Sequence, residues 1–364
     1  MTMAAWGEFC LRAGEFMHRK FLWIMLGAYA VAAIAPWPGH WIRSTRIGNA
    51  AFLGQSAGVP LTSLLLALLL FNAGLGIQTG RLRNLLRRPF VLLVGLLANL
   101  LVPLLFIVAM SLTLRVWHNP AEVECILVGL ALVASMPVAG SSTAWSQNAN
   151  GDLALSMGLV VLSTCLSPFT TPALLEAVGW LASGAYSECL HTLAGGETSY
   201  FLLTFVLAPS LLGIGVRCLF GDGPIQKVKP ILKLLNSANL LVLCYSNATV
   251  ALPQTVANPD WDFLAIVLAI VVALCAIGFA SGWAISRLLA TDAEQRVSLM
   301  FGLGMNNNGT GLVLAATALA HLPSVMLPLI LYNLVQHVAA AVTGHCANRT
   351  SVARNLLLFR TRSW

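Results

Sequence analysis

Residues with amide or hydroxyl side chains inside apolar runs are those of this chain best placed to do chemistry. Residues 302–316 read GLGMNNNGTGLVLAA, and the consecutive amides Asn306, Asn307 and Asn308 stand between glycines. Lipid offers no hydrogen-bond partners, so loosened polar backbone at membrane depth persists only where it is buried in protein or lines a wet cavity. We therefore expect this stretch to interrupt a membrane helix.

A second stretch of the same kind lies in the first half of the chain. Residues 135–143 read SMPVAGSST, again between apolar runs. Pro137 lacks an N–H and clashes with the preceding turn, so a break there frees backbone carbonyls. Two interrupted helices in matching halves are the best sequence pointer to the binding site of a secondary transporter.

The two breaks also predict the chemistry of the site. Half-helices that begin near Ala139 and Asn308 would direct the positive ends of their dipoles at the centre, which suits an anion such as a carboxylate. Nearby amides can donate to a ligand or accept from it. The ordinary alternatives are that the small residues let helices approach closely and that the amides only cap the half-helices. The predicted substrate-binding residues are Ser141, Ser142, Thr143, Asn306, Asn307, Asn308, Thr310, Asn333 and His337.

Two ionisable residues in or near apolar runs need interpretations of their own. His337 follows Asn333 by four residues, so both lie on one helix face. An ionisable group in a span is costly and suggests a transport pathway, and a neutral His bonded between helices is the equal alternative. Asp152 follows Gly151 at the start of an apolar run, and we expect it to cap that helix rather than to carry protons.

The composition places the chain in a lipid bilayer. Hydrophobic residues make up 58% and charged residues 9%, whereas soluble domains carry about 25% charged residues. The net charge of +7 does not indicate nucleic-acid binding, because the basic residues lie at helix ends. The eight cysteines form no CxxC and no metal-ligand spacing, so we expect no resident cofactor. No GxSxG, HExxH or P-loop motif is present, which argues against an enzyme.

The 364 residues leave room for about ten spans of roughly 20 residues each. The predicted fold is therefore an all-α polytopic membrane protein, with a polar loop over residues 183–199 between its two halves. The ten expected spans cover about residues 21–38, 57–79, 89–113, 122–148, 152–177, 200–219, 231–252, 262–289, 294–320 and 324–346.

The distribution of basic residues supports an even number of spans. With residues 1–20 and the basic tail 347–364 both cytoplasmic, 17 of the 20 Lys and Arg residues fall on the inside, among them the dense group at 81–88. Only Arg43, Arg46 and Arg115 fall outside. The positive-inside rule predicts this bias, and we expect an integral protein of a bacterial inner membrane.

The two halves correspond in the spacing of their spans. Counted five and five, the broken fourth span matches the broken ninth, so that Met136-Pro137 aligns with Met305-Asn306. Halves of five spans have opposite orientations in the membrane, so the correspondence predicts an inverted repeat.

Several motifs resemble those of the bile acid:sodium symporter superfamily. They are LLLALLLFNAGLGIQ at 64–78, the GD-x-ALS run at 151–156, the LSP-x-x-TPAL run at 166–174 and the GM-x-N motif at 304–307, and the similarity spans about residues 20–345. The resemblance implies a core of spans 3–5 and 8–10, whose broken helices cross at the centre. It further implies a panel of spans 1, 2, 6 and 7, with an organic anion bound between panel and core and sodium as the usual coupling ion.

The resemblance also implies where sodium would bind, and this chain departs there. The family's Ser-Asn pair falls at Ser142-Thr143 and its span-5 serine at Ser156, but its acidic residue falls at Gly302. The shared carboxylate is therefore absent, and an uncompensated buried cation is expensive. The ion-binding residues carried over by the resemblance are Ser142, Thr143, Ser156, Asn99, Gly302 and Met305.

The sequence thus favours a secondary transporter of a small organic anion, and leaves its oligomeric state, substrate and coupling ion open. Proton-coupled or facilitated transport is the nearest alternative. Efflux of an inorganic oxyanion, as by the related arsenite permeases, ranks lower because Met136 and Gly302 replace the cysteine and acid on which those proteins rely. A non-transporting sensor or scaffold is the alternative from another class.

Overall fold

The computed structural model describes residues 3–48, 58–78, 80 and 89–361. These residues are almost entirely helical, and their one sheet is the short antiparallel pair β1 (Arg46–Ile47) and β2 (Val59–Pro60). The prediction of an all-α protein is confirmed. The basic group Arg81, Arg83, Arg87 and Arg88 lies outside the described residues.

The helices follow the apolar runs of the sequence. The first half contains α1 (Met3–Ile34), α2 (Trp37–Ser44), α3 (Leu61–Gly76), α5 (Pro89–Thr113), η2 (Leu114–Val116), α6 (Pro120–Ser135), α7 (Gly140–Asn148) and α8 (Leu153–Gly179). The rest contains α9 (Gly184–Ala194), α10 (Gly196–Leu202), η3 (Leu203–Leu207), α11 (Ala208–Phe220), α12 (Asp222–Ala248), α13 (Leu252–Ala257), α14 (Trp261–Leu288), α15 (Ala293–Gly304), α16 (Asn308–Ala318), η4 (Pro323–Val325) and α17 (Met326–Thr361).

Both predicted helix breaks are present. The first separates α6 from α7 at residues 136–139, and the second separates α15 from α16 at residues 305–307. The new half-helices begin at Gly140 and Asn308, as the sequence predicts. The N-cap role expected of Asp152 is also confirmed, because its carboxylate accepts from the backbone nitrogens of Ala154 and Leu155 at 2.9 and 3.1 Å.

Five described helices are long and apolar enough to cross a membrane, and the bent pair of α1 and α2 raises that number to six. The two broken helices consist of segments of 16, 9, 12 and 11 residues, each shorter than the roughly 20 residues that a span needs. Ten spans and an inverted repeat therefore stay predictions.

Several boundaries differ from the prediction, and one prediction is wrong. Residues 183–199 form helices α9 and α10 rather than a polar loop, because Leu190 and Leu193 turn a buried apolar face to the protein. The first span ends at Ile34, where Pro36 and Pro38 accompany a 92° turn into α2. Helices α12 and α17 extend beyond the predicted spans, so that most of the basic tail continues α17.

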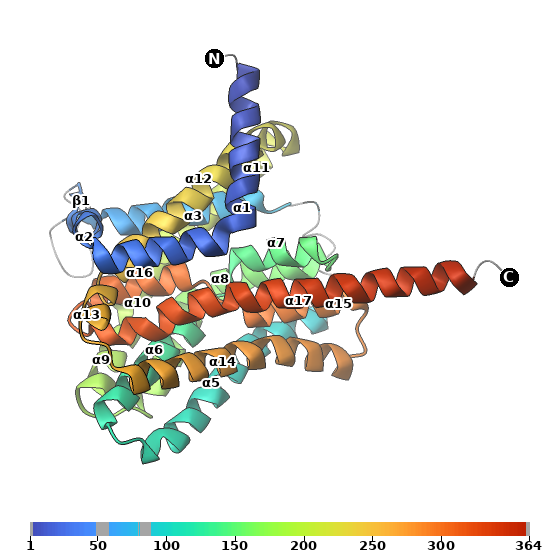
Figure 1. The fold of residues 1–364 in the computed structure, drawn as a ribbon. Helices are drawn as coiled ribbons and strands as arrows, with labels where there is room; N and C mark the ends of the chain where they lie inside the picture. Colours follow the sequence, from blue (N-terminus) through green and yellow to red (C-terminus); the bar gives the residue numbers. More distant parts are fainter. Residues whose placement is uncertain (1–2, 49–57, 79, 81–88, 362–364) are drawn as a thin grey trace.

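The helices pack as two groups (Figure 1). Helices α1, α3, α11 and α12 pack on one another at one side of the molecule. Helices α5, α6, α8, α14, α15 and α17 pack together at the other side, and α16 lies against both groups through contacts with α3, α12 and α17. The two helix breaks therefore stand where the groups meet.

Candidate functional site

The two breaks contact each other directly through their backbones. Val138 and Asn306 form an isolated antiparallel β-bridge. The Ala139 nitrogen donates to the Met305 carbonyl at 2.9 Å, and the Asn307 nitrogen donates to the Pro137 carbonyl at 2.9 Å. Each break thus supplies hydrogen-bond partners that the other loses by leaving the helix, as backbone in an apolar surrounding requires.

Side chains from neighbouring helices satisfy further backbone groups at the crossing. The Asn306 amide donates to the Val133 carbonyl at 3.0 Å, and its backbone nitrogen donates to Gln336 Oε1 at 3.0 Å. Ser163 of α8 accepts from the Val138 nitrogen at 3.0 Å, and Thr171 donates to the Ser135 carbonyl at 2.6 Å. Ser163, Thr171 and Gln336 were not among the predicted site residues, since their partners come from distant parts of the chain.

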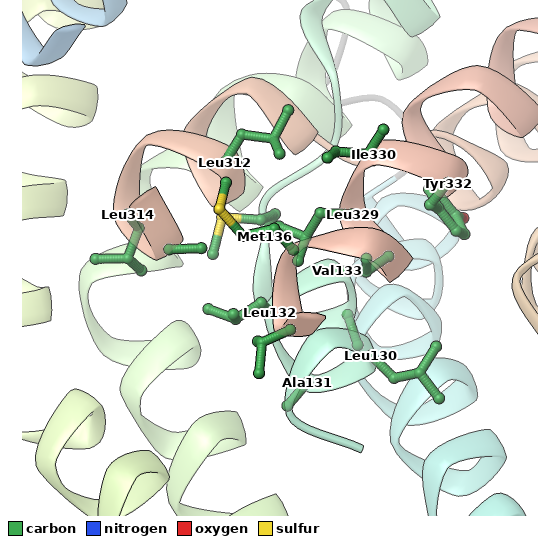
Figure 2. Close-up of a cluster of buried hydrophobic side chains, with 14 of the residues drawn as sticks. Leu130, Ala131, Leu132, Val133, Met136, Leu312, Leu314, Leu329, Ile330 and Tyr332 are labelled. Atoms are coloured by element: carbon green, nitrogen blue, oxygen red, sulfur yellow. The ribbon is translucent and has the colours of Figure 1, made fainter. Parts of the chain in front are cut away.

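Apolar packing fixes the crossing from the side of α17. Figure 2 shows Met136 beside Leu312 of α16 and Leu329 of α17. A Cβ added at Gly311 would lie 2.8 Å from Leu329 Cδ2 and 3.2 Å from Met136 Cγ, so only glycine fits there without displacement. The crossing is therefore held by packing as well as by hydrogen bonds.

The N-termini of both half-helices point toward the other helix group. A Cβ added at Gly140 would lie 3.7 Å from Ala73 of α3, and one added at Gly309 would lie 3.7 Å from Leu240 of α12. The first turns of α7 and α16, with their positive dipole ends, thus stand at the boundary between the groups.

Unpartnered polar side chains lie at the N-terminus of α16, and others occur elsewhere in the two helix groups. Asn308 and Thr310 are 1% and 0% exposed, and neither side chain has a hydrogen-bond partner. A buried polar group left unpaired costs about 1–3 kcal/mol, so such groups require explanation. Ser63 of α3, Asn247 of α12 and Ser142 of α7 are likewise buried with unpartnered polar atoms.

Comparison with known proteins decides the family. Residues 19–348 match the SBF-like CPA transporter family. This chain belongs to that family. Among its relatives, it is 27% identical over 266 residues to YocS of Bacillus subtilis, named an uncharacterized sodium-dependent transporter, covering 71% of this chain and 74% of YocS. It is 27% identical over 321 residues to the probable sodium/metabolite cotransporter BASS1, chloroplastic, of Oryza sativa subsp. japonica, covering 86% of this chain and 69% of that protein.

Membership of the SBF-like CPA transporter family confirms the predicted superfamily and the prediction of a transporter rather than an enzyme. With its apolar helices, the chain is an integral membrane protein.

The three consecutive asparagines of this family member have different surroundings. Asn306 is bonded to backbone, as described above. Asn307 caps α16, because its Oδ1 accepts from the Thr310 nitrogen at 3.4 Å. Asn308 alone is buried with both polar atoms of its side chain unpartnered. A role for Asn306 and Asn307 in substrate binding stays a prediction.

The predicted hydroxyls of α7 also differ from one another. Ser142 is 0% exposed with an unpartnered Oγ, whereas Ser141 is half-buried at the first turn. Thr143 Oγ1 accepts from Ser156 Oγ of α8 at 3.2 Å. Thr143 and Ser156 are thus in contact through uncharged oxygens, and a role for them or for Ser142 in ion binding stays a prediction.

Asn333 and His337 on α17 lie among other side chains. Asn333 Nδ2 donates to the Tyr29 hydroxyl at 2.9 Å, and its Oδ1 accepts from Gln336 at 3.3 Å. His337 is buried and meets Phe21 edge-on, with ring centroids 5.4 Å apart. Asn333 thus joins α17 to α1. Binding of substrate by Asn333 and by His337 stays a prediction.

The sodium arrangement that the resemblance implies does not fit these residues. A Cβ added at Gly302 would lie 2.7 Å from Leu159 Cδ1, so apolar packing fills the position of the missing carboxylate. Leu159 belongs to a small buried cluster with Leu155 and Leu299, against which Val160 packs. The Met305 carbonyl already accepts from Ala139, and Asn99 is buried in α5 with an unpartnered Oδ1. The remaining oxygens bear no negative charge.

The hydroxyls of Ser146 and Ser298 bond to each other at the C-terminal end of α7, which is predicted to face the cytoplasm. Ser298 of α15 donates to the Asp152 carbonyl at 2.7 Å and lies 2.8 Å, oxygen to oxygen, from Ser146. The Asp152 nitrogen also donates to the Glu294 carbonyl at 3.0 Å. These contacts tie α7, α8 and α15 together, and nothing in the spacing of the residues along the sequence indicated the pair.

Proposed function

We propose that this protein is a secondary transporter that moves a small organic anion by alternating access. The observation that carries the proposal is the pair Asn308 and Thr310, buried and unpartnered at the N-terminus of α16 where the two helix groups meet. A helix N-terminus favours anions, and polar atoms without protein partners are available to a ligand. The near-complete burial of both residues corresponds to a closed conformation of the site.

The architecture of the proposal follows the resemblance. The panel consists of α1, α3, α11 and α12, the core of α5–α8 and α14–α17, and ten spans form an inverted repeat with both termini cytoplasmic. The mutual bonding of the two breaks supports a core that moves as one body, since separating α7 from α16 would leave backbone groups unpaired at membrane depth. Movement of core against panel would then open the site to either side.

We further propose that transport does not use the carboxylate-dependent sodium site of the family. Two relatives carry sodium in their names. In this chain, Leu159 occupies the space beside Gly302, and a sodium ion there would lack a negative partner. Replacing sodium by choline is expected to change uptake by less than about twofold. An ion that does not bind the protein does not shift its equilibria by mass action.

Uptake into proteoliposomes tests the site. The Asn308→Ala variant is expected to lose about 100-fold in transport efficiency, because two hydrogen bonds of about 1.4 kcal/mol each would be lost. Ser281→Ala on α14, where the hydroxyl bonds only to its own helix at Gly278, is the matched control and should keep full uptake. Full uptake by a folded Asn308→Ala protein would contradict the proposed site.

A further inference from the structure

Helix α1 of the panel also contacts α17 of the core directly. Phe21, Met25 and Tyr29 are spaced i, i+4 and i+8 and so lie on one face of α1. On α17, His337 packs edge-on against Phe21, with ring centroids 5.4 Å apart. Asn333, one turn earlier, reaches Tyr29 and Met25. These residues form a buried contact between the two helix groups.

A chain of hydrogen bonds runs from this contact to the break between α15 and α16. Asn333 Nδ2 donates to the Tyr29 hydroxyl at 2.9 Å, and Asn333 Oδ1 accepts from Gln336 Nε2 at 3.3 Å. Gln336 Oε1 in turn accepts from the Asn306 backbone nitrogen at 3.0 Å. All four residues are at most 5% exposed, so bulk water has little access to these bonds.

The direction of the chain is set at Asn306. A backbone N–H can only donate, so the oxygen of Gln336 must face it and the nitrogen of Gln336 must face Asn333. The oxygen of Asn333 then faces Gln336, which leaves its nitrogen for Tyr29. Flipping either amide would set donor against donor. The Tyr29 hydroxyl is therefore the acceptor that ends the chain.

Only the last bond of the chain crosses between the groups. The bonds that join Asn333, Gln336 and Asn306 lie within the core, whereas Tyr29 belongs to the panel. The other panel atoms near Asn333 Nδ2 are sulfurs, Cys244 Sγ at 3.4 Å and Met25 Sδ at 3.5 Å, and sulfur is a weak acceptor. Without the Tyr29 hydroxyl, Asn333 would keep a buried N–H with no strong acceptor.

We infer that the Tyr29–Asn333 hydrogen bond holds panel against core in the closed conformation, and that Gln336 is a positioning residue that orients the Asn333 amide for it. This inference rests on the proposed function, because the closed conformation is one state of alternating access. Movement of the core away from the panel would break this bond and leave the rest of the chain intact. A substrate that opens the protein must offset its loss by binding the open state more tightly.

Cys244 reports directly on this contact. It is 0% exposed on α12 of the panel and faces Asn333 of the core, so separation of the groups would uncover it. Cys275 of α14 is also 0% exposed, but its Sγ lies 3.9 Å from the Gly304 carbonyl, inside the core. Two full-length proteins, each keeping one of these cysteines and carrying alanine at the other seven, are labelled with N-ethylmaleimide and followed by intact mass.

Tyr29→Phe removes the acceptor and little else. The open population should rise about three- to tenfold, because one hydrogen bond is lost from the closed state alone. Labelling follows that population when opening is fast, so Cys244 should react about three- to tenfold faster while the rate at Cys275 stays unchanged. An unchanged Cys244 rate, or equal acceleration at both cysteines, would overturn the inference.

A matched control and a second variant sharpen the result. Tyr245→Phe removes the bond from that hydroxyl to the Ala35 carbonyl at 2.6 Å, which stays within the panel, so Cys244 should keep its rate although Tyr245 is its neighbour. Equal acceleration in this control would mean local loosening and would overturn the inference.

Asn333→Leu removes the donor of the same bond and should also accelerate Cys244. Adding Tyr29→Phe to it should produce no further increase, because both changes remove one interaction. Fully additive effects would contradict a shared bond.

The labelling needs no substrate, so it decides the role of the Tyr29–Asn333 bond whether or not an anion is transported. Uptake of organic anions by the unaltered protein in proteoliposomes is measured separately. Uptake with an unchanged Cys244 rate in Tyr29→Phe would leave transport standing and reject the bond as the contact that holds the closed state. Failure of every anion to cross would count against the proposed function.

Discussion

On one side of the helix crossing, Gly302 of α15 packs against Leu159 of α8, and on the other, Asn308 and Thr310 of α16 are buried with unpartnered polar atoms. Both regions lie next to the same break, and both are nearly inaccessible to solvent. The first is an apolar contact at the position where the resemblance implies a carboxylate. The second keeps polar atoms at a cost of about 1–3 kcal/mol each, which packing alone does not explain.

We infer from the difference that the region around Gly302 and the region proposed to bind substrate can change independently. Gly302 supplies no charge that would need a cation, and Leu159 occupies the space where a side chain at this position would lie. At the N-terminus of α16, by contrast, the amide of Asn308 stays buried without a partner. Four sets of substitutions can break or sharpen this comparison.

The largest effect is expected on the apolar side. Gly302→Glu would force a carboxylate into the space of Leu159, at a cost of about 1–3 kcal/mol for overpacking and about 3–5 kcal/mol for an uncompensated buried charge. Little folded protein should be recovered by size-exclusion chromatography.

The double variant Gly302→Glu with Leu159→Ala supplies the missing space. It should recover folded protein in sodium chloride more than in choline chloride, since a cation would then be bound. Normal recovery of the single variant would show that Leu159 does not fill the site.

The next effect separates two adjacent amides. Asn306→Ala leaves the Val133 carbonyl without its donor, so the protein should lose about 1–3 kcal/mol of stability and its apparent Tm should fall. Asn308→Ala removes an amide that has no partner, and the cavity left behind offsets the relief of its burial cost, so its Tm should change little while uptake is lost. Equal falls in Tm for the two variants would contradict the different roles.

The sequence predicted the two breaks, their boundaries and the caps, because Pro137, the asparagine run and Asp152 act through the backbone of their own segments. It could not distinguish Asn306 from Asn308, because the distinction depends on Val133 and Gln336, which are far away in the chain. Nor could it show that Leu159 fills the space beside Gly302. The sequence predicts a loop over residues 183–199 because polar residues surround the few apolar residues that form the buried face of α9.

A smaller effect of opposite sign is expected at Thr310. Thr310→Val replaces an unpartnered buried hydroxyl by a methyl group of similar size, so the ligand-free protein should gain about 1 kcal/mol of stability. Uptake should fall, because the hydroxyl is available to the substrate. Ser298→Ala is the matched opposite, since its hydroxyl is bonded to Asp152 and its loss should lower Tm.

The smallest effect concerns the far end of α16. Arg43 of α2 donates to the Ala316 carbonyl at 2.9 Å and so joins α2 to α16 near the C-terminus of that helix. Arg43→Gln should cost about 0.3–1 kcal/mol, the usual contribution of a cation there. The closed state would then be less favoured, and a cysteine introduced at Thr310 should react faster with a membrane-impermeant thiol reagent. An unchanged labelling rate would argue that this contact does not hold the site closed.

The apparent Tm of the purified protein, titrated with sodium chloride against choline chloride of equal ionic strength, tests the central claim most directly. An ion that binds the folded state raises stability in a saturable way. Because Leu159 fills the carboxylate position and the remaining oxygens of Ser142, Thr143 and Ser156 are neutral, we predict identical curves in the two salts. A saturable rise with sodium alone, lost in Ser142→Ala, would contradict the account.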